Sequence, residues 1–345
     1  MKKIFFAAMA MTAMLASCSK NAETTVPTPD DGSTPQVQIT LKADDQQTRA
    51  FFDNTAAAEA WEKEVTALTI YVYDQSGNIL VRRSMSASEV AAKSALFSLP
   101  NSAAGKNCTF YVVANANYGE VISTAAMDNQ IESLTLDEYN GTFAQTAEGR
   151  KRSAGFVMTG KTTTAIASAG NTTTVPVTVK RVVAKIAVRA KLADDFTTLY
   201  NGGRVVITSA NIKQANDFSY SFANAGGVYS GTYLYTHTQA SNVSGTEYQN
   251  MFYVYERESG GLPANKYLIT LTGYFDADGN MSTTYDQSDT EFSITLYGHG
   301  DGEIKRNGYY RIDATIKGLS GNGLLVNLTV ADWETPVTQS LELGI

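Results

Sequence analysis

The stretch "TTTVPVTVKRVVAKIAVRAKL", residues 172–192, carries the pattern that sets the fold class of the chain. Apolar and polar residues alternate in it with the two-residue period of a β-strand that buries one face. It predicts two strands, one around Val175 to Val179 and one from Val182 to Val188. A Thr- and Gly-rich stretch, residues 160–174, ends where this new set of strands begins. We therefore expect a boundary between two domains near residue 180.

The same alternation runs from residue 36 to the C-terminal end of the chain and predicts a mostly-β protein. The predicted strands lie in VQITLKA (37–43), LTIYVYDQSGNIL (68–80, with a turn at Gly77-Asn78), TFYVVANAN (109–117), GRVVITSANI (203–212), MFYVYERE (251–258), KYLITLTGYFDADGN (266–280), SITLYG (293–298), YYRIDATIKG (309–318) and LLVNLTVADW (324–333). Helical patterns are sparse. One short helix is predicted in NTAAAEAWEKEV (54–65), capped by Asp53 or Asn54, and another at 132–140.

The composition excludes some classes of partner. With 345 residues, 43% of them hydrophobic and 18% charged, the chain has enough apolar material for two domains of ordinary size. Its formal net charge of -7 provides no basic surface for nucleic acid or an anionic membrane, because like charges repel. We therefore expect an acidic, extracytoplasmic protein that binds no nucleic acid.

The first 17 residues predict a secretory signal peptide. Lys2 and Lys3 form a short positive region, and the apolar run from Ile4 to Leu15 is too short to span a bilayer as a helix. The residues "LASC" at 15–18 resemble the bacterial lipobox, in which the cysteine thiol receives a lipid before cleavage. Cys18 is therefore the predicted lipidation site. The alternative is an ordinary signal peptide followed by an incidental cysteine.

Residues 18–35 are rich in Ser, Thr, Pro and Asp and predict a flexible tether. Such a segment cannot bury enough apolar area to offset the entropy of ordering it. The chain has one other cysteine, Cys108, so a lipidated Cys18 leaves no pair for an intramolecular disulfide. We expect Cys108 to be a small buried residue of the core.

Catalytic motifs are absent from the sequence. The two histidines, His237 and His299, are too few for a multi-histidine metal site, and no GxSxG, P-loop or CxxC spacing occurs. Two carboxylates distant in sequence can meet in space, so a glycoside-hydrolase pair stays open as an alternative. We predict no catalytic residue, no cofactor and no metal.

The turn "DADGN", from Asp276 to Asn280, has the alternating oxygen side chains and the glycine of a calcium loop. The residues that follow it lack the glutamate that closes such a loop. A tight hairpin with Gly279 at positive φ explains the same residues without an ion. We favour the hairpin.

Several segments together resemble the fimbrillin family of the Bacteroidetes, the FimA/Mfa-type pilus subunits. They are the lipobox, the tether, an alternating strand shortly before an isolated arginine, "KRVVAKIAV" at 180–188, "NGYYRIDATIKG" at 307–318 and "LTVADWE" at 328–334. The resemblance covers essentially the whole chain. It implies a pair of transthyretin-like β-sandwich domains in tandem, here residues 36–180 and 181–345, and export to the outer membrane as a lipoprotein.

The same resemblance implies maturation by an arginine-specific protease. Cleavage of the Arg49–Ala50 bond would remove the first strand, residues 36–43, together with the propeptide up to residue 49. A strand from a neighbouring subunit then fills the opened groove, and the C-terminal segment from about 334 to 345 is the expected donor. The polar stretch before Arg49 makes this bond accessible. Arg82-Arg83 and Arg150-Lys151-Arg152 are competing basic sites.

Residue pattern supports the exchange apart from the family resemblance. Both segments alternate with period two, so that a donor can present apolar groups at the spacing of the strand it replaces. The apolar positions are Val37, Ile39, Leu41 and Ala43 in the displaced strand and Val337, Leu341, Leu343 and Ile345 in the donor. Gln339 is the one polar interruption on the donor's apolar face.

Three classes of function follow, with different partners. The first is a pilus stalk subunit, which binds identical or related subunits, an arginine-specific protease and, before maturation, outer-membrane lipid. The second is a pilus anchor or tip adhesin that binds a host or glycan ligand through exposed tyrosines and donates no strand. The third is a carboxylate-based surface hydrolase. We favour the stalk subunit, located first in the outer membrane and then in the extracellular fimbrium.

N-terminal sequencing of protein from sheared surface filaments tests the maturation scheme. We expect the mature chain to start at Ala50, because cleavage after Arg49 frees the groove for a neighbouring subunit. A lipidated Cys18 at the start of every recovered molecule would contradict a stalk role.

Overall fold

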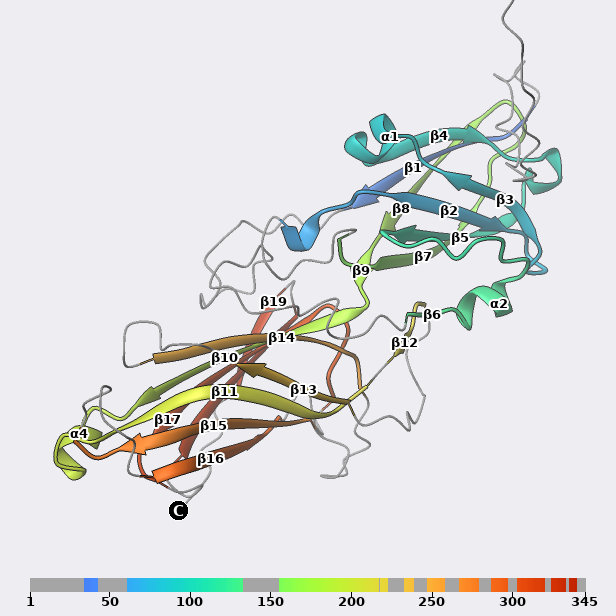
Figure 1. Cartoon of the computed structure of the whole chain (residues 1–345). Helices are drawn as coiled ribbons and strands as arrows, with labels where there is room; N and C mark the ends of the chain where they lie inside the picture. The colour runs from blue at the N-terminus through green and yellow to red at the C-terminus, as the bar shows by residue number, and fades with distance from the viewer. Residues whose placement is uncertain are drawn as a thin grey trace, which may run out of the picture.

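The computed structural model describes residues 34–42, 61–132, 155–216, 218–222, 233–238, 247–257, 267–278, 287–296, 303–319, 324–332 and 335–339. These residues form a mostly-β structure in which most strands lie in two stacks of sheets (Figure 1). We call the described residues up to Arg181 the N-terminal half and those from Val182 the C-terminal half.

The N-terminal half contains a three-stranded and a five-stranded sheet. The smaller sheet has the order β4-β1-β8, with β4 at Ser94–Ser98, β1 at Gln36–Lys42 and β8 at Thr172–Thr178. The larger has the order β3-β2-β5-β7-β9, at Ile79–Ser84, Leu68–Tyr73, Asn107–Ala114, Met158–Ala165 and Lys180–Arg181. Inward side chains of both sheets, such as Ile39 and Phe110, belong to one buried hydrophobic cluster.

The C-terminal half contains a five-stranded and a four-stranded sheet. The first has the order β14-β10-β17-β18-β19, at Glu247–Tyr255, Val183–Leu192, Gly308–Ile316, Leu324–Asp332 and Thr335–Gln339. The second has the order β13-β11-β15-β16, at Tyr233–Thr238, Arg204–Ala215, Leu268–Asp276 and Gln287–Thr295. In the first sheet β10 and β17 run parallel, and the other pairs are antiparallel.

Residues 172–192 form one nearly continuous extended run through three different sheets. Its first part is β8, its middle is β9 and its last part is β10; only Val179 and Val182 lie outside these strands. The strands predicted around Val175 and from Val182 to Val188 are therefore confirmed in position. The chain passes from one half to the other through a single bend at Val182, between β9 and β10, without a longer loop.

Helices are short in the described chain. They are η1 at Trp61–Lys63, α1 at Ala87–Ala92, η2 at Asn101–Ala103, α2 at Thr124–Asp128 and α4 at Phe196–Leu199. The helix predicted at 54–65 is wrong in its described part, because only the single 3₁₀ turn of η1 forms and residues 64–67 are not helical. The rest of that prediction, and residues 133–140 of the second one, lie outside the described residues. The sequence reading missed α1, although Ser86 and Glu89 form a capping box at its start.

The interior strand β2 of the larger N-terminal sheet is buried on both faces. Ile70 and Val72 face the main core, whereas Tyr71 and Tyr73 belong with Tyr111 to a second cluster on the opposite face. Val121, which precedes α2, and Met127 of α2 pack against the three tyrosine rings of this second cluster. Burial raises the pKa of Tyr73 and of Tyr111 above the ordinary tyrosine range, so both hydroxyls stay protonated.

One glycine lies where two strands approach closely. Gly273 of β15 is paired with Ile207 at a register shift of β11, and a Cβ at this glycine would overlap the carbonyl oxygen of Val206. Gly273→Ala is therefore expected to destabilise the protein by at least about 1 to 3 kcal/mol, as overpacking does. Chemical denaturation measures this loss. Ser293→Ala, at an exposed position of β16, is the control and should change stability by less than about 0.5 kcal/mol.

Candidate functional site

β1 is the middle strand of its sheet and, among the described strands, the only one that pairs with both of its neighbours. It pairs antiparallel with β4 from Gln36 to Thr40 and parallel with β8 from Gln36 to Lys42. Among the described strands, β4 pairs with no strand except β1, and the same holds for β8. Removal of β1 would leave two facing strand edges one strand-width apart. We call this position between β4 and β8 the β1 slot.

The inward face of β1 is apolar, as the alternation predicts. Val37 and Ile39 are fully buried and Leu41 is 9% exposed, whereas Gln38 points to solvent. The predicted displaced-strand residues Val37, Ile39 and Leu41 thus share one buried face, and the fourth, Ala43, lies outside the described residues.

The side chains of β4 and β8 that line the β1 slot differ in size along its length. Val37 is paired with Phe97 of β4, and Ile39 is paired with Ala95 on one side and Val175 on the other. Leu41 is paired with Val177 of β8. These wall residues are buried, so an occupant of the slot replaces part of the hydrophobic core.

The C-terminal segment begins as the edge strand β19. It pairs antiparallel with β18 through Gln339, with Val337 opposite Val330. The other predicted donor residues, Leu341, Leu343 and Ile345, lie outside the described residues. The described part of the segment therefore belongs to the sheet of its own C-terminal half.

The predicted processing residues Cys18, Arg49 and Ala50 lie outside the described residues, as do residues 150–152. The competing pair Arg82 and Arg83 is described and lies within β3, which is paired with β2. Arg83 forms a 2.6 Å ion pair with Glu89, and the guanidinium of Arg82 donates to Asn117. The peptide bond between Arg82 and Arg83 therefore lies in a paired strand and not in a loop.

The residues weighed for metal and catalytic roles do not converge. Asp276 is buried at the end of β15, and its carboxylate faces the guanidinium of Arg204 at 3.6 Å, which disfavours a cation there. β15 and its antiparallel neighbour β16 are joined by residues 277–286, a connection longer than the predicted tight hairpin, and Gly279 lies outside the described residues. Over the described ranges, no three His, Cys, Asp or Glu side chains are grouped to hold a metal. Cys108 is a free, buried thiol, as predicted.

The two halves meet around a buried set of polar side chains, which we call the knot: Glu62, Arg181, Lys185, Tyr253 and Asn307. The ammonium of Lys185 pairs with the Glu62 carboxylate at 2.8 Å, and both side chains are almost fully buried. The Tyr253 hydroxyl donates to the same carboxylate. Arg181 donates from Nε to the Glu62 carbonyl oxygen at 2.7 Å and from Nη1 to Asn307 Oδ1 at 2.8 Å. Removal of one partner would leave a buried charge uncompensated.

Aromatic rings surround the knot. Trp61 packs edge-on against Tyr253 at 5.8 Å and tilted against Phe156 at 5.6 Å between ring centroids. Phe156 also contacts Tyr253 at 4.7 Å. Because Trp61 and Phe156 belong to the N-terminal half and Tyr253 to the C-terminal half, these rings join the two halves into one hydrophobic cluster.

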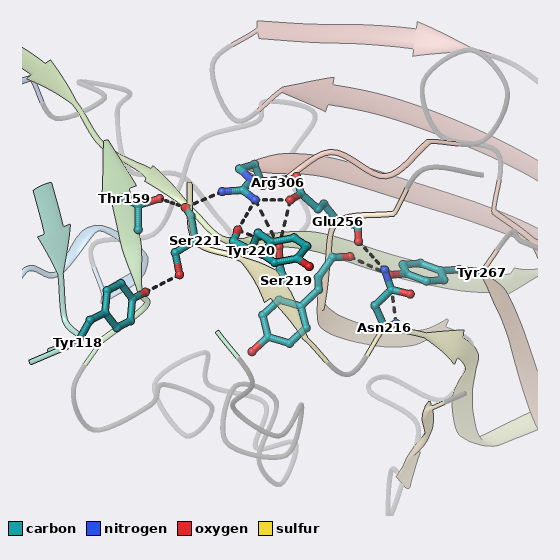
Figure 2. Close-up of polar contacts among 10 residues, drawn as sticks. Tyr118, Thr159, Asn216, Ser219, Tyr220, Ser221, Glu256, Tyr267 and Arg306 are labelled. Atoms are coloured by element: carbon teal, nitrogen blue, oxygen red, sulfur yellow. Dashed lines mark hydrogen bonds and ion pairs between the residues drawn. The ribbon is translucent and has the colours of Figure 1, made fainter. Parts of the chain in front are cut away.

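A second set of polar contacts, which we call the clasp, holds the segment from Ser219 to Ser221 (Figure 2). Arg306 forms an ion pair with Glu256 and donates to the carbonyl oxygens of Tyr220 and Ser221. Ser219 Oγ donates to the same Glu256 carboxylate at 3.0 Å. The guanidinium thus ties this segment to the C-terminal half.

The other side of the clasp segment contacts the N-terminal half. Tyr118 and Ser221 share a hydrogen bond of 2.7 Å between their hydroxyls, and Thr159 Oγ1 donates to the Ser221 carbonyl oxygen (Figure 2). The two-residue strands β12, Ser219–Tyr220, and β6, Ile131–Glu132, pair antiparallel. Burial raises the pKa of Tyr118, so its hydroxyl remains neutral and able to donate.

Sequence reasoning did not single out the residues of the knot and the clasp. Arg181 and Lys185 were quoted within "KRVVAKIAV", but a charged residue in a strand pattern is ordinarily taken to face solvent. Lys185 lies among apolar neighbours on both sides, and that is the one local signal for a buried, paired charge. Its partner Glu62 is far away in sequence.

The comparisons with known proteins identify the family of this chain. The profile of the family described as "Fimbrillin-A associated anchor proteins Mfa1 and Mfa2" matches residues 29–338. The chain belongs to this family of Bacteroidetes fimbrial proteins, and the resemblance noted in the sequence is confirmed. No curated protein sequence matches the chain.

Solved structures of fimbrial proteins share the fold. A fimbrillin from Porphyromonas gingivalis is 20% identical, with a TM-score of 0.58 over 89% of this chain and 99% of that one. A putative cell adhesion protein from Bacteroides eggerthii is 15% identical, with a TM-score of 0.58 over 88% and 97% of the two chains. The tip fimbrial protein Mfa3 from Porphyromonas gingivalis is 15% identical, with a TM-score of 0.52 over 87% and 100%.

Family membership settles the class of function. The chain is a fimbrial protein of the cell surface, and its family consists of structural proteins that associate with other fimbrial subunits. It is not an enzyme, which removes the hydrolase alternative. None of the helices in the described ranges has the length and apolar character needed to span a membrane.

Truncation of the central β1 side chain tests how much the slot depends on its occupant. Ile39→Ala should destabilise the uncut protein by about 2 to 5 kcal/mol, because it leaves a cavity between Ala95 and Val175. Gln38→Ala on the exposed face of the same strand is the control and should cost less than about 0.5 kcal/mol. Urea denaturation of both variants provides the measurement; equal losses would contradict the assignment of the buried face.

Proposed function

We propose that the chain is a stalk subunit of a surface pilus, exported as a lipoprotein, cut after Arg49 and polymerised by strand exchange. The observation that carries this proposal is the position of β1. Among the described strands it alone joins β4 to β8, and it lies at the N-terminal end of the described chain, upstream of Arg49. A single cut after it would free a complete slot.

The energetics of the slot favour a strong junction. Burial of three aliphatic side chains contributes roughly 1.5 to 3 kcal/mol each, or about 5 to 9 kcal/mol before ordering costs, and ladder hydrogen bonds add to it. In the precursor β1 has the advantage of a high effective concentration, which a neighbouring chain cannot match. The cut removes this advantage. The exposed edges of β4 and β8 then favour capture of another strand.

The donor in this proposal is the last six residues, "SLELGI" at 340–345. β19 occupies Thr335–Gln339 in its own sheet, so we assign the donor to the residues after Gln339. Their apolar residues Leu341, Leu343 and Ile345 match the buried face of β1 in number and spacing. Gln339, the polar interruption in the predicted donor, then stays outside the slot.

Location of the basic sites supports cleavage at Arg49. Proteases cut accessible, flexible segments and spare paired strands, and Arg82-Arg83 lies within β3. The segment "DDQQT" before Arg49 is polar, and the bond lies seven positions beyond Lys42, the last residue of β1. An arginine-specific protease is therefore the proposed maturation partner.

Two further parts of the proposal follow the family resemblance. Cys18 carries the lipid that holds the precursor in the outer membrane before maturation. The sandwiches at 36–180 and 181–345 are transthyretin-like domains in tandem, supported by the change of sheet along residues 172–192.

An anchor subunit is the second candidate. It is favoured by the family description, which names anchor proteins, and by β19, which pairs with β18 of its own half. An anchor would keep both β1 and the lipid on Cys18. The alternative of glycan stacking on tyrosines has less support, since Tyr71, Tyr73 and Tyr111 are buried.

Changes at the C-terminus test strand donation. Replacement of Leu341, Leu343 and Ile345 by serine should leave secreted, folded monomers that no longer extend filaments, because the donor loses its apolar face. Electron microscopy and size-exclusion chromatography of surface protein measure both results. The matched control is Ser340→Ala with Glu342→Gln, which changes only the opposite face and should leave filaments normal. Normal filaments from the triple serine variant would refute the proposed donor.

A further inference from the structure

We propose that the knot and the clasp together form a rigid joint that carries tension between the two halves of the subunit. The source of the tension rests on the proposed strand exchange, whereas the rigidity of the joint is independent of it. The turn at Arg306-Asn307 is the centre of this joint. Asn307 accepts a hydrogen bond from Arg181, where the chain crosses between the halves. Arg306 donates to Tyr220 and Ser221 of the clasp segment, which contacts the N-terminal half.

The covalent path of the load is the run of residues 172–192. An occupant of the slot pairs with β8, which continues through β9 into β10. β10 pairs with β17, β17 pairs with β18 and β18 pairs with β19, which directly precedes the proposed donor. In a filament, a pull on either end would therefore cross between the halves at Arg181 and Val182.

The crossing point is fixed on both sides by the knot. The Arg181 side chain is 4% exposed and bonds to the Glu62 backbone in the N-terminal half and to Asn307 in the C-terminal half. Asn307 also donates its backbone N–H to the Val183 carbonyl oxygen at 2.9 Å. The chain at Arg181 and Val182 therefore cannot rotate one half against the other unless the buried hydrogen bonds of the charged Arg181 side chain break.

The conformation of Asn307 suits this role. It has a φ of +56°, in the left-handed region that asparagine tolerates better than most residues, and it is buried. The turn aims the Asn307 amide at Arg181 and the Arg306 guanidinium at the carbonyl oxygens of Tyr220 and Ser221. β17 starts at the next residue, Gly308. The contacts of Arg306 and Asn307 are therefore attached directly to a strand on the path of the load.

The clasp supplies a second tie at a different point of the interface. Ser221 bonds to Tyr118 and Thr159 of the N-terminal half, and its N–H donates to the Gln130 carbonyl oxygen at 2.8 Å. Phe222 packs edge-on against Tyr111 at 4.8 Å. Because the knot and the clasp join the halves at two separate points, they resist bending between the halves as well as extension. A single point of connection would not resist bending.

Maturation would leave the joint intact. Trp61 and Glu62 anchor the N-terminal side of the knot and lie downstream of Arg49. Cleavage at Arg49 would therefore remove β1 without removing any side chain of the knot or the clasp. The slot can exchange its occupant while the halves keep their relative orientation.

Single-molecule force spectroscopy on the full, uncut chain tests the joint. Handles attach at Thr174→Cys in β8 and Lys317→Cys after β17, both exposed, with Cys18→Ser removing the competing thiol. The protein with its native joint should show no extension before one half unfolds. Arg306→Gln with Asn307→Gly should add an extension step at lower force, because Gly keeps the positive φ but removes the amide.

Matched controls separate the joint from general destabilisation. Asn201→Gly also removes a side chain at positive φ, and Arg189→Gln breaks the Arg189–Asp313 ion pair within the C-terminal half. Neither control should add the low-force step. If the main variant does not fold, Tyr118→Phe with Thr159→Val removes only hydroxyl contacts to Ser221 and should shift the first event to lower force.

Two results would overturn the joint: a low-force extension in the protein with its native joint, or traces of the joint variants identical to those of the controls. Because the measurement uses single uncut molecules, it does not depend on polymerisation. Failure of the donor variants to block filaments would refute strand donation and leave the rigid joint standing.

Discussion

The rest of the structure depends on the extended run of residues 172–192. A strand satisfies its backbone groups only by pairing, and this run pairs successively in three sheets. As β8 it forms one wall of the β1 slot, as β9 it joins the larger N-terminal sheet, and as β10 it lies inside a C-terminal sheet. The slot and the C-terminal half therefore share one backbone, and a displacement of either is transmitted to the other unless the joint yields.

β1 lies at the centre of its sheet, but its covalent connection to the downstream strands can be removed by one cut. It is a central strand with a fully apolar inner face, yet it is joined to the strands downstream of it through residues after Lys42 and pairs with strands distant in sequence. Its contribution to stability is thus large, while one cut of the chain separates it covalently. These two properties together suit a strand that is exchanged and not merely lost, because the vacant edges of β4 and β8 retain strong pairing capacity.

Many strand positions and the inner face of β1 were predictable because they depend on local alternation, as Val37, Ile39 and Leu41 illustrate. The strands β4, β7 and β13 were not predicted. Sheet order was not predictable, since the parallel pairing of β1 with β8 joins segments more than a hundred residues apart. The knot was missed for a related reason: Glu62 and Lys185 resemble solvent-facing charges in the sequence, and only the meeting of the two halves buries and pairs them. The proposed processing residues Cys18 and Arg49 rest on motif and resemblance alone, and both lie outside the described residues.

Cross-linking within filaments tests the exchange of β1 most directly. Gln38 is paired with Thr174 in the uncut chain. We propose that Leu341 of a neighbouring subunit takes the place of Val37, so that Glu342 takes the place of Gln38. With Thr174→Cys and Glu342→Cys in the same chain, a short thiol cross-linker should join consecutive subunits into a covalent ladder after cleavage. Filaments that form normally but yield only single, uncross-linked chains would contradict the account.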